Sequence, residues 1–83
     1  MKSDRSIELS MRYTPVRSLK YSRNARTHSK HQIRQIANSI KSFGFTKPIF
    51  IDWNSVIIAG HGRFEAAKLL GMDQVPTIAK GVH

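Results

Sequence analysis

The sequence contains no cysteine, which excludes disulfides, thiolate zinc sites and cysteine nucleophiles. Acidic residues are scarce: five Asp and Glu stand against 14 Lys and Arg, giving a formal net charge of +9. The five acids are scattered, whereas a metal-dependent nuclease needs clustered carboxylates. Long apolar runs are also missing, since the longest, Val56–Ala59, is far shorter than the roughly 20 residues of a membrane-spanning helix. We therefore expect a cytoplasmic protein without sulfur chemistry.

The length of 83 residues, 40% of them hydrophobic, suits one small domain. We expect residues 1–6 to be disordered and residues 7–83 to form this domain. Because the sequence stops directly after the last predicted strand, we also expect a fragment of a longer protein, with a further domain attached after residue 83.

The positive charge is concentrated in the N-terminal half. Residues 1–36 hold nine basic and two acidic residues, whereas residues 37–83 hold five and three. Such a field attracts polyanions, and a nucleic-acid or nucleotide partner is favoured over charge that serves only the solubility of a small basic protein. Five basic residues are candidates for a patch that contacts DNA phosphates, although an ordinary solvated surface explains them equally well: Arg17, Lys20, Arg23, Lys30 and Arg34.

The first half of the chain shows a strand pattern followed by a helix pattern. Apolar and polar residues alternate over Ile7–Met11, which indicates a half-buried strand that ends at Tyr13-Thr14-Pro15. Ser29 and Gln32 form a capping box before an apolar face of helical spacing, and Gly44 is a natural stop. This pattern predicts a helix over about residues 30–43.

The second half predicts a hairpin, a helix and a last strand. Residues 48–53 and 55–59 are rich in strand formers and flank a turn at Asn54, a second helix covers about residues 62–70, and residues 75–78 form a short strand. The order is strand, helix, strand, strand, helix, strand, which indicates a compact α+β domain with a small mixed sheet and two main helices. A helix-turn-helix with its corner at Gly44 is the alternative, but Pro48 opposes a recognition helix there.

The turn Gly60-His61-Gly62-Arg63 leads into the second helix without a Ser, Thr, Asp or Asn cap. The free N–H groups and the dipole of a helix start attract an anion, and glycine lets that anion approach the backbone. Arg63 adds a forked donor. We predict that Gly60, His61, Gly62 and Arg63 bind phosphate; in the alternative interpretation, the glycines only permit a tight turn and Arg63 lies in solvent.

Several segments together resemble the N-terminal domain of the ParB family, in the ParB/sulfiredoxin superfamily. They are Asn24-Ala25-Arg26, the helix QIRQIANSIKSFGF, Lys47-Pro48-Ile49 and VIIAGHGRFEAAKLLGMDQVPTI, and the resemblance spans residues 7–79. Within the superfamily, the sequence looks most similar to ParB-like domains of prophage-type DNA methyltransferases and related phage proteins. The resemblance implies the ParB/sulfiredoxin-like α+β fold, and much of the superfamily carries the label of a nuclease domain.

The resemblance also implies a ligand site. The family signature Gly-Glu-Arg-Arg-x-Arg-Ala-Ala, which binds the phosphates of CTP, falls on residues 60–67, where Gly60, Arg63, Ala66 and Ala67 match. His61 stands in place of the acid linked to hydrolysis, and Gly62 and Glu65 replace two arginines. Sulfiredoxins use a cysteine at the position of His61, so their reaction is impossible here. Implied ligands are CTP or ATP with Mg²⁺, with two further residues as walls of the site: Arg26 and Lys47.

Two functions stay open at this stage. The first is a nucleotide- or phosphate-binding domain associated with DNA binding, partition or modification, with triphosphatase or nuclease activity implied only by the family. The second is a DNA-binding accessory module of a phage-type DNA methyltransferase without nucleotide turnover. DNA and a nucleotide are the expected partners, and a homodimer is a further alternative.

The remaining candidate residues have ordinary explanations that we prefer. A zinc site built from the four histidines, His28, His31, His61 and His83, is less favoured than solvated side chains. For His61, contact with phosphate is favoured over general-base catalysis, and a structural role is nearly as well supported. Four aromatic residues are expected at the core or its edge rather than stacked on bases: Phe43, Phe45, Phe50 and Trp53.

Overall fold

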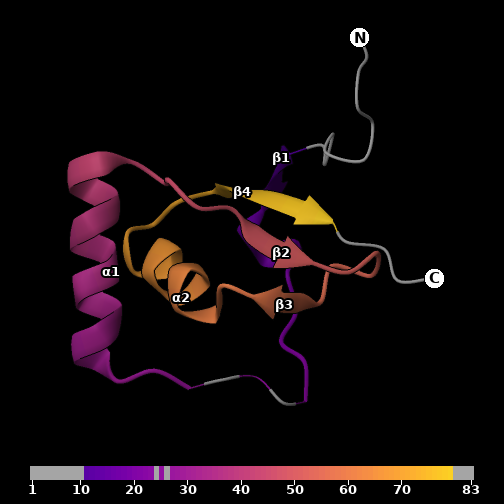
Figure 1. Cartoon of the computed structure of the whole chain (residues 1–83), viewed down its shortest axis with the longest axis horizontal. Helices are drawn as coiled ribbons and strands as arrows, with labels where there is room; N and C mark the ends of the chain where they lie inside the picture. The colour runs from indigo at the N-terminus through magenta and orange to yellow at the C-terminus, as the bar shows by residue number, and fades with distance from the viewer. Residues whose placement is uncertain (1–10, 24, 26, 80–83) are drawn as a thin grey trace, which may run out of the picture.

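The computed structural model describes residues 11–23, 25 and 27–79, and its elements follow the predicted order (Figure 1). They are β1 (Met11–Pro15), the 3-10 helix η2 (Val16–Ser18), α1 (Lys30–Phe43), β2 (Ile49–Ile51), β3 (Ile57–Ala59), α2 (His61–Leu69) and β4 (Gln74–Ala79). The α+β prediction is confirmed. A strand follows the turn at Gly44, where a helix-turn-helix would place its recognition helix, so that alternative is wrong.

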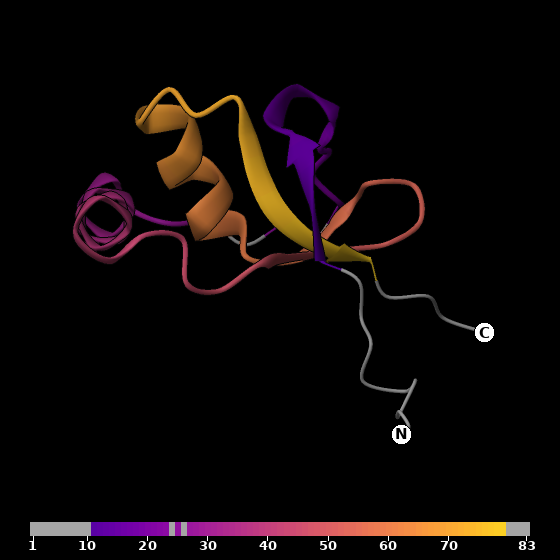
Figure 2. The same cartoon turned by 90° about the horizontal axis from the view of Figure 1, so that it is seen from above.

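The four strands form one mixed sheet in the order β1-β4-β2-β3. Strand β4 lies antiparallel to β1 and parallel to β2, and β2 forms an antiparallel hairpin with β3. Figures 1 and 2 show α2 beside the sheet and α1 on the far side of α2. Helix α1 is therefore the outermost layer, and it reaches the rest of the domain mainly through α2.

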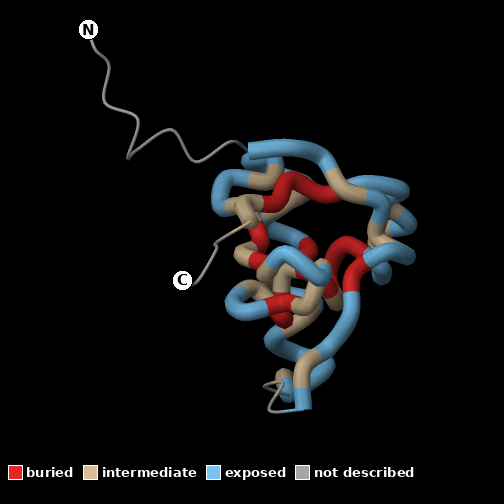
Figure 3. Tube along the Cα trace, turned by 90° about the vertical axis from the view of Figure 1, so that its right-hand side faces the viewer, coloured by how far each residue is buried: buried red, intermediate tan, exposed pale blue. Residues whose placement is uncertain are grey.

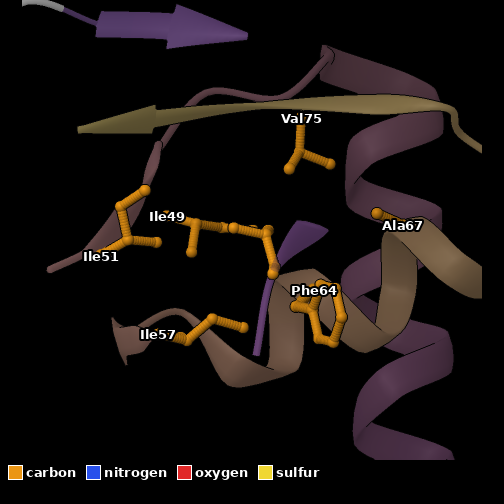
Figure 4. Packing of buried hydrophobic residues seen from close by; sticks show 7 residues of the cluster. Ile49, Ile51, Ile57, Phe64, Ala67 and Val75 are labelled. Atoms are coloured by element: carbon orange, nitrogen blue, oxygen red, sulfur yellow. The ribbon is translucent and has the colours of Figure 1, made fainter. Parts of the chain in front are cut away.

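The hydrophobic core lies between the sheet and α2. Alternate residues of β2 point toward the helix, where Phe64 and Ala67 meet them (Figure 4). The buried stretches of the chain meet in the interior of the domain (Figure 3). Leu19 is buried, and the half-buried Val16 packs against the same cluster. The cluster comprises Leu19, Ile49, Ile51, Ile57, Phe64, Ala67 and Val75.

Helix α1 has the predicted ends. The Gln32 backbone N–H donates to Ser29 Oγ at 3.1 Å, and the Ser29 N–H donates to Gln32 Oε1 at 3.0 Å, which completes the capping box. The helix stops at Gly44, whose φ of 82° is in the left-handed range that favours glycine. Of the α1 residues only Ala37 is buried, so much of its apolar face stays accessible.

The turn of the β2–β3 hairpin is closed by one carboxylate. Asp52 Oδ1 accepts the backbone N–H groups of Asn54 at 2.8 Å and Val56 at 2.9 Å. An Asp that binds the backbone a few residues ahead is a usual way to fix a tight turn. The prediction of a hairpin at this place is confirmed.

The first strand is shifted relative to the prediction. Residues 7–10 lie outside the described part of the chain, and Tyr13-Thr14-Pro15 continue β1 instead of ending it. The reason is pairing: Met11 faces Ile78 and Pro15 faces Gln74, so β1 runs along nearly the whole of β4.

The placement of the aromatic side chains was predicted only in part. Phe43 is 77% exposed and Trp53 is 69% exposed, so their expected place at the core is wrong. Phe43 is the last residue of the outer helix, and Trp53 lies in the hairpin turn, so neither reaches the core. Phe45 packs against the core and Phe50 is half-buried, as expected.

Candidate functional site

The start of α2 is open. Strand β3 ends at Ala59, Gly60 takes a left-handed conformation (φ 105°, ψ 24°), and α2 begins at His61. No side chain in the described part of the chain caps this helix. A Cβ at Gly60 would lie 3.3 Å from Ile49 Cα and 2.9 Å from Arg63 Nη2, so both the backbone angle and the space require glycine.

Arg63 uses one hydrogen-bond donor of its guanidinium within the protein, and a second donor has no partner among the described residues. Its Nη2 donates to the carbonyl oxygen of Pro48 at 3.0 Å. Its Nε is buried and has no hydrogen-bond partner among the described residues. Desolvation by burial lowers the pKa of Arg63, although a guanidinium stays charged at neutral pH. A buried, unpaired donor on a cation is costly, and an anion would satisfy it.

A cavity of about 680 Å³ opens at this helix start. It lies between α1, the loop of residues 44–47 and the turn of residues 58–63, with His28 from the segment before α1. Lys47 and Arg63 are its charged side chains, and no acidic residue of the described chain lines it. The size lies within the roughly 300–1,000 Å³ of small-molecule sites.

Gly62 allows α1 and α2 to pack closely against each other. It is buried, and a Cβ there would lie 2.7 Å from Ile36 Cδ1 and 3.1 Å from His28 Nε2. The missing side chain therefore makes room for α1 and His28, and does not open space for an anion. The backbone N–H of Gly62 still belongs to the first turn of α2, where it points out of the helix.

His61 is held by packing. It is 8% exposed, and its ring lies edge-on to Tyr21 with 5.5 Å between the ring centroids. Tyr21 also contacts Phe64 on the next turn of α2. Although His61 lines the cavity, the position of its ring favours the structural role over that of a mobile base.

The structure brings together five of the six residues predicted to bind phosphate. Gly60, His61, Gly62, Arg63 and Lys47 all line the cavity. Arg26, the sixth, lies outside the described residues. Sequence reasoning missed His28 as a wall of this site, as well as Ser39 of α1 and Thr46 of the following loop. They come from segments far from the glycine turn in the sequence, so no local pattern could have identified them.

The five residues predicted to contact DNA do not gather in one place. Lys30 and Arg34 lie one turn apart on α1 and are exposed. Arg17 belongs to η2, and Figures 1 and 2 show α2 between η2 and α1. Lys20 is exposed beside Val56, and Arg23 is exposed in the connection that leads to α1. The pair on α1, Lys30 and Arg34, forms a local cationic surface.

The described residues contain neither a metal-ligand cluster nor a membrane-spanning helix. No group of three or more His, Cys, Asp and Glu side chains could hold a metal ion there, and His83 lies outside that part of the chain. None of the helices that the structure describes has the length and apolar composition needed to cross a membrane.

The comparison with known families is decisive for the domain type. Residues 2–83 match the ParB N-terminal domain family. The chain belongs to this family. It is 51% identical over 74 residues to the ParB-like nuclease domain-containing protein YnaK of Escherichia coli K12, covering 88% of this chain and 85% of that protein. It is 39% identical over 51 residues to a probable chromosome-partitioning protein ParB of Rickettsia felis, covering 61% of this chain and 18% of that protein.

Solved structures confirm the ParB/sulfiredoxin-like fold. The C-terminally truncated ParB of Caulobacter crescentus complexed with CTP-γ-S has a TM-score of 0.78 and 24% identity, covering 89% of this chain and 46% of that chain. The same ParB complexed to the centromeric parS site gives 0.74 and 25%, with 87% and 41% covered. A sulfiredoxin from Arabidopsis thaliana gives 0.77 and 17%, with 88% and 86% covered. This ParB-type domain therefore spans less than half of the matched ParB chains.

Proposed function

We propose that this ParB-type domain binds a nucleotide through its phosphates, in the cavity between α1 and α2. One observation carries the proposal: Arg63 Nε is buried without a partner among the described residues, beside a helix start that no described side chain caps. The ParB structure complexed with CTP-γ-S shares the fold and supports the choice of ligand.

Each residue of the site has a role in this proposal. Gly60 gives the turn its left-handed conformation, the first N–H groups of α2 donate to the phosphate, and Arg63 adds a charge-assisted hydrogen bond. Lys47 neutralises further charge from the loop before β2, and Arg26 is proposed as a second wall. His61 holds the helix start in place by packing on Tyr21.

CTP or ATP with Mg²⁺ are the proposed ligands. The cavity volume and its cationic lining fit a nucleotide. Because no acidic residue of the described chain lines the cavity, Mg²⁺ would arrive on the phosphates and keep several waters, which is common for this ion. The proposal covers binding; phosphate release measured in the same samples reports whether turnover occurs.

The test is an amide NMR titration with Mg-CTP and Mg-ATP. The signals of residues 60–64 should shift, and Arg63→Ala should weaken binding by about 10- to 100-fold, the value of one strong charge-assisted contact. Arg12→Ala on β1 is the matched control, because Arg12 is exposed and does not line the cavity. Unchanged spectra with both nucleotides, or equal affinity of Arg63→Ala and wild type, would reject the proposal.

A second function is favoured by the exposed cations of α1 and by the net charge of +9. In this role the cytoplasmic domain contacts DNA phosphates through Lys30 and Arg34. It would act in partition, or as an accessory to a covalently attached domain of a phage-type DNA methyltransferase. The ParB structure with parS supports DNA as a partner.

Duplex DNA should then shift the amide signals of α1, with affinity falling steeply as salt rises. Shifts confined to residues 60–64 would reject it.

A further inference from the structure

His28 lies against the open start of α2 and not in solvent. A Cβ built on Gly62 would lie 3.1 Å from His28 Nε2 and 3.2 Å from His28 Cδ2, so the edge of the imidazole ring covers the glycine. The residue is half-buried and lines the same cavity as Arg63 and Lys47. One ring nitrogen, Nε2, therefore lies beside Gly62 in the first turn of α2, on the wall of the cavity.

The position of His28 is fixed by its neighbour in the sequence. Ser29 is the N-cap of α1, and its reciprocal hydrogen bonds with Gln32 set the direction in which the chain enters the helix. Ile36 of α1 packs on Gly62 beside His28. The contact between α1 and α2 thus places the imidazole over the turn.

The charges that face His28 are all positive or neutral. Helix α2 contributes Arg63 and the buried ring of His61, and the loop before β2 contributes Lys47. Helix α1 lines the cavity with Ile36, Ser39 and Ile40, none of which titrates. No carboxylate of the described residues is present there to pair with an imidazolium. For a protonated imidazole at this place, an entering anion would supply the opposite charge that the described lining lacks.

We propose that His28 is a pH-dependent anion ligand of this site: its protonated ring donates a charge-assisted hydrogen bond to the bound phosphate, which is stronger than any hydrogen bond that its neutral form makes. The inference rests on the proposed function, because it assigns a further contact to the same cavity. Histidine ordinarily changes charge between pH 5 and 8. By linkage, a group that binds the anion better when protonated makes anion affinity rise as the pH falls.

The experiment uses sodium sulfate as the probe, because sulfate keeps its double charge between pH 6 and pH 8 while phosphates titrate near pH 6. Sulfate affinity, followed by the amide signals of residues 60–64, should be about five- to tenfold higher at pH 6 than at pH 8 for wild type. His28→Gln should bind with the wild-type affinity of pH 8 at both pH values. His31→Gln, an exposed neighbour on α1 that does not line the cavity, should keep the full dependence.

A second measurement needs no variant. The ring proton signals of His28 in the wild-type protein at pH 6 should shift when sulfate is added, whereas those of His31, which does not line the cavity, should not. Sulfate affinity that is equal at both pH values, or an undiminished dependence in His28→Gln, overturns the role of His28. Absence of sulfate, CTP and ATP binding at either pH rejects the proposed function itself, so the two failures are distinct.

Discussion

The two main helices begin in opposite ways. Helix α1 is closed by its own side chains, since Ser29 and Gln32 exchange two hydrogen bonds across its first turn. Helix α2 begins at Gly60 without a side-chain cap from the described residues, beside a cavity lined by Arg63 and Lys47. When side chains of the helix itself accept hydrogen bonds from its first backbone N–H groups, these groups need no other partner. When the first N–H groups are free and lie beside cations, they favour an external anion.

The difference follows from backbone geometry. The N-cap residue Ser29 has extended angles (φ −71°, ψ 160°), which let its hydroxyl reach the N–H three residues ahead. Gly60 has φ 105° and ψ 24°, because the chain must turn sharply from β3 into α2 beside Ile49. Side chains rarely tolerate that conformation, so the turn that shapes the site also excludes an ordinary cap.

The largest expected effect comes from Gly60→Ala. Left-handed strain and a Cβ 3.3 Å from Ile49 Cα should together lower the free energy of unfolding by about 2–4 kcal/mol. The matched control is Gly71→Ala just after α2, where φ is 73° and no atom lies within 4 Å of the built Cβ. It should cost only about 1 kcal/mol. Urea unfolding measures both; equal costs would show that Gly60 is not specially constrained by its surroundings.

The next effect tests whether the missing side chain of Gly62 lets α1 pack closely on α2. Gly62→Ala should destabilise the domain by about 1–2 kcal/mol, because its Cβ would lie 2.7 Å from Ile36 Cδ1. Ile36→Val removes that Cδ1 atom, so the double variant should be more stable than the sum of the single effects by about 0.5–1 kcal/mol. Strict additivity in urea unfolding would contradict the assigned contact.

The sequence predicted the parts of this contrast that are local. Both ends of α1 followed from Ser29, Gln32 and Gly44, because caps and stops are decided within a few residues. The missing cap before α2 and the strand-to-helix turn at Gly60 were equally visible. The hairpin followed from short β-branched runs around a turn, and the α+β order then followed from the elements themselves.

The rest depends on contacts between segments far apart in the sequence. Gly62 looked like part of a phosphate cradle, but it is the packing of Ile36 and His28 that requires glycine there. Phe43 and Trp53 were expected in the core, yet Phe43 ends α1, Trp53 lies in the hairpin turn, and both are largely exposed. Periodicity reports which side chains share a face of an element, and it does not report how far a neighbouring element extends over that face.

At the closed helix start, Ser29→Ala should remove one side of the capping box and lower the free energy of unfolding by about 1 kcal/mol. Ser42→Ala in the exposed last turn of α1 is the matched control and should change it by less than about 0.5 kcal/mol. If Ser29→Ala and Ser42→Ala change the free energy of unfolding equally, the capping box does not stabilise α1. The start of α1 would then not differ in stability from an uncapped helix start.

The smallest effect is expected beyond the open turn, on the outer side of α2. Glu65 pairs with Lys68 at 3.4 Å, one helical turn along, with both side chains partly exposed. Such surface pairs contribute only about 0.2–0.5 kcal/mol, because water screens the charges and ordering two side chains costs entropy. Glu65→Gln should therefore change the free energy of unfolding by no more than this amount, and 1 M salt should abolish the difference from wild type. A loss of more than about 1 kcal/mol in the free energy of unfolding would mean that Glu65 stabilises the start of α2 through a contact other than this pair. In that case a side chain would stabilise the start of α2, as Ser29 and Gln32 stabilise the start of α1.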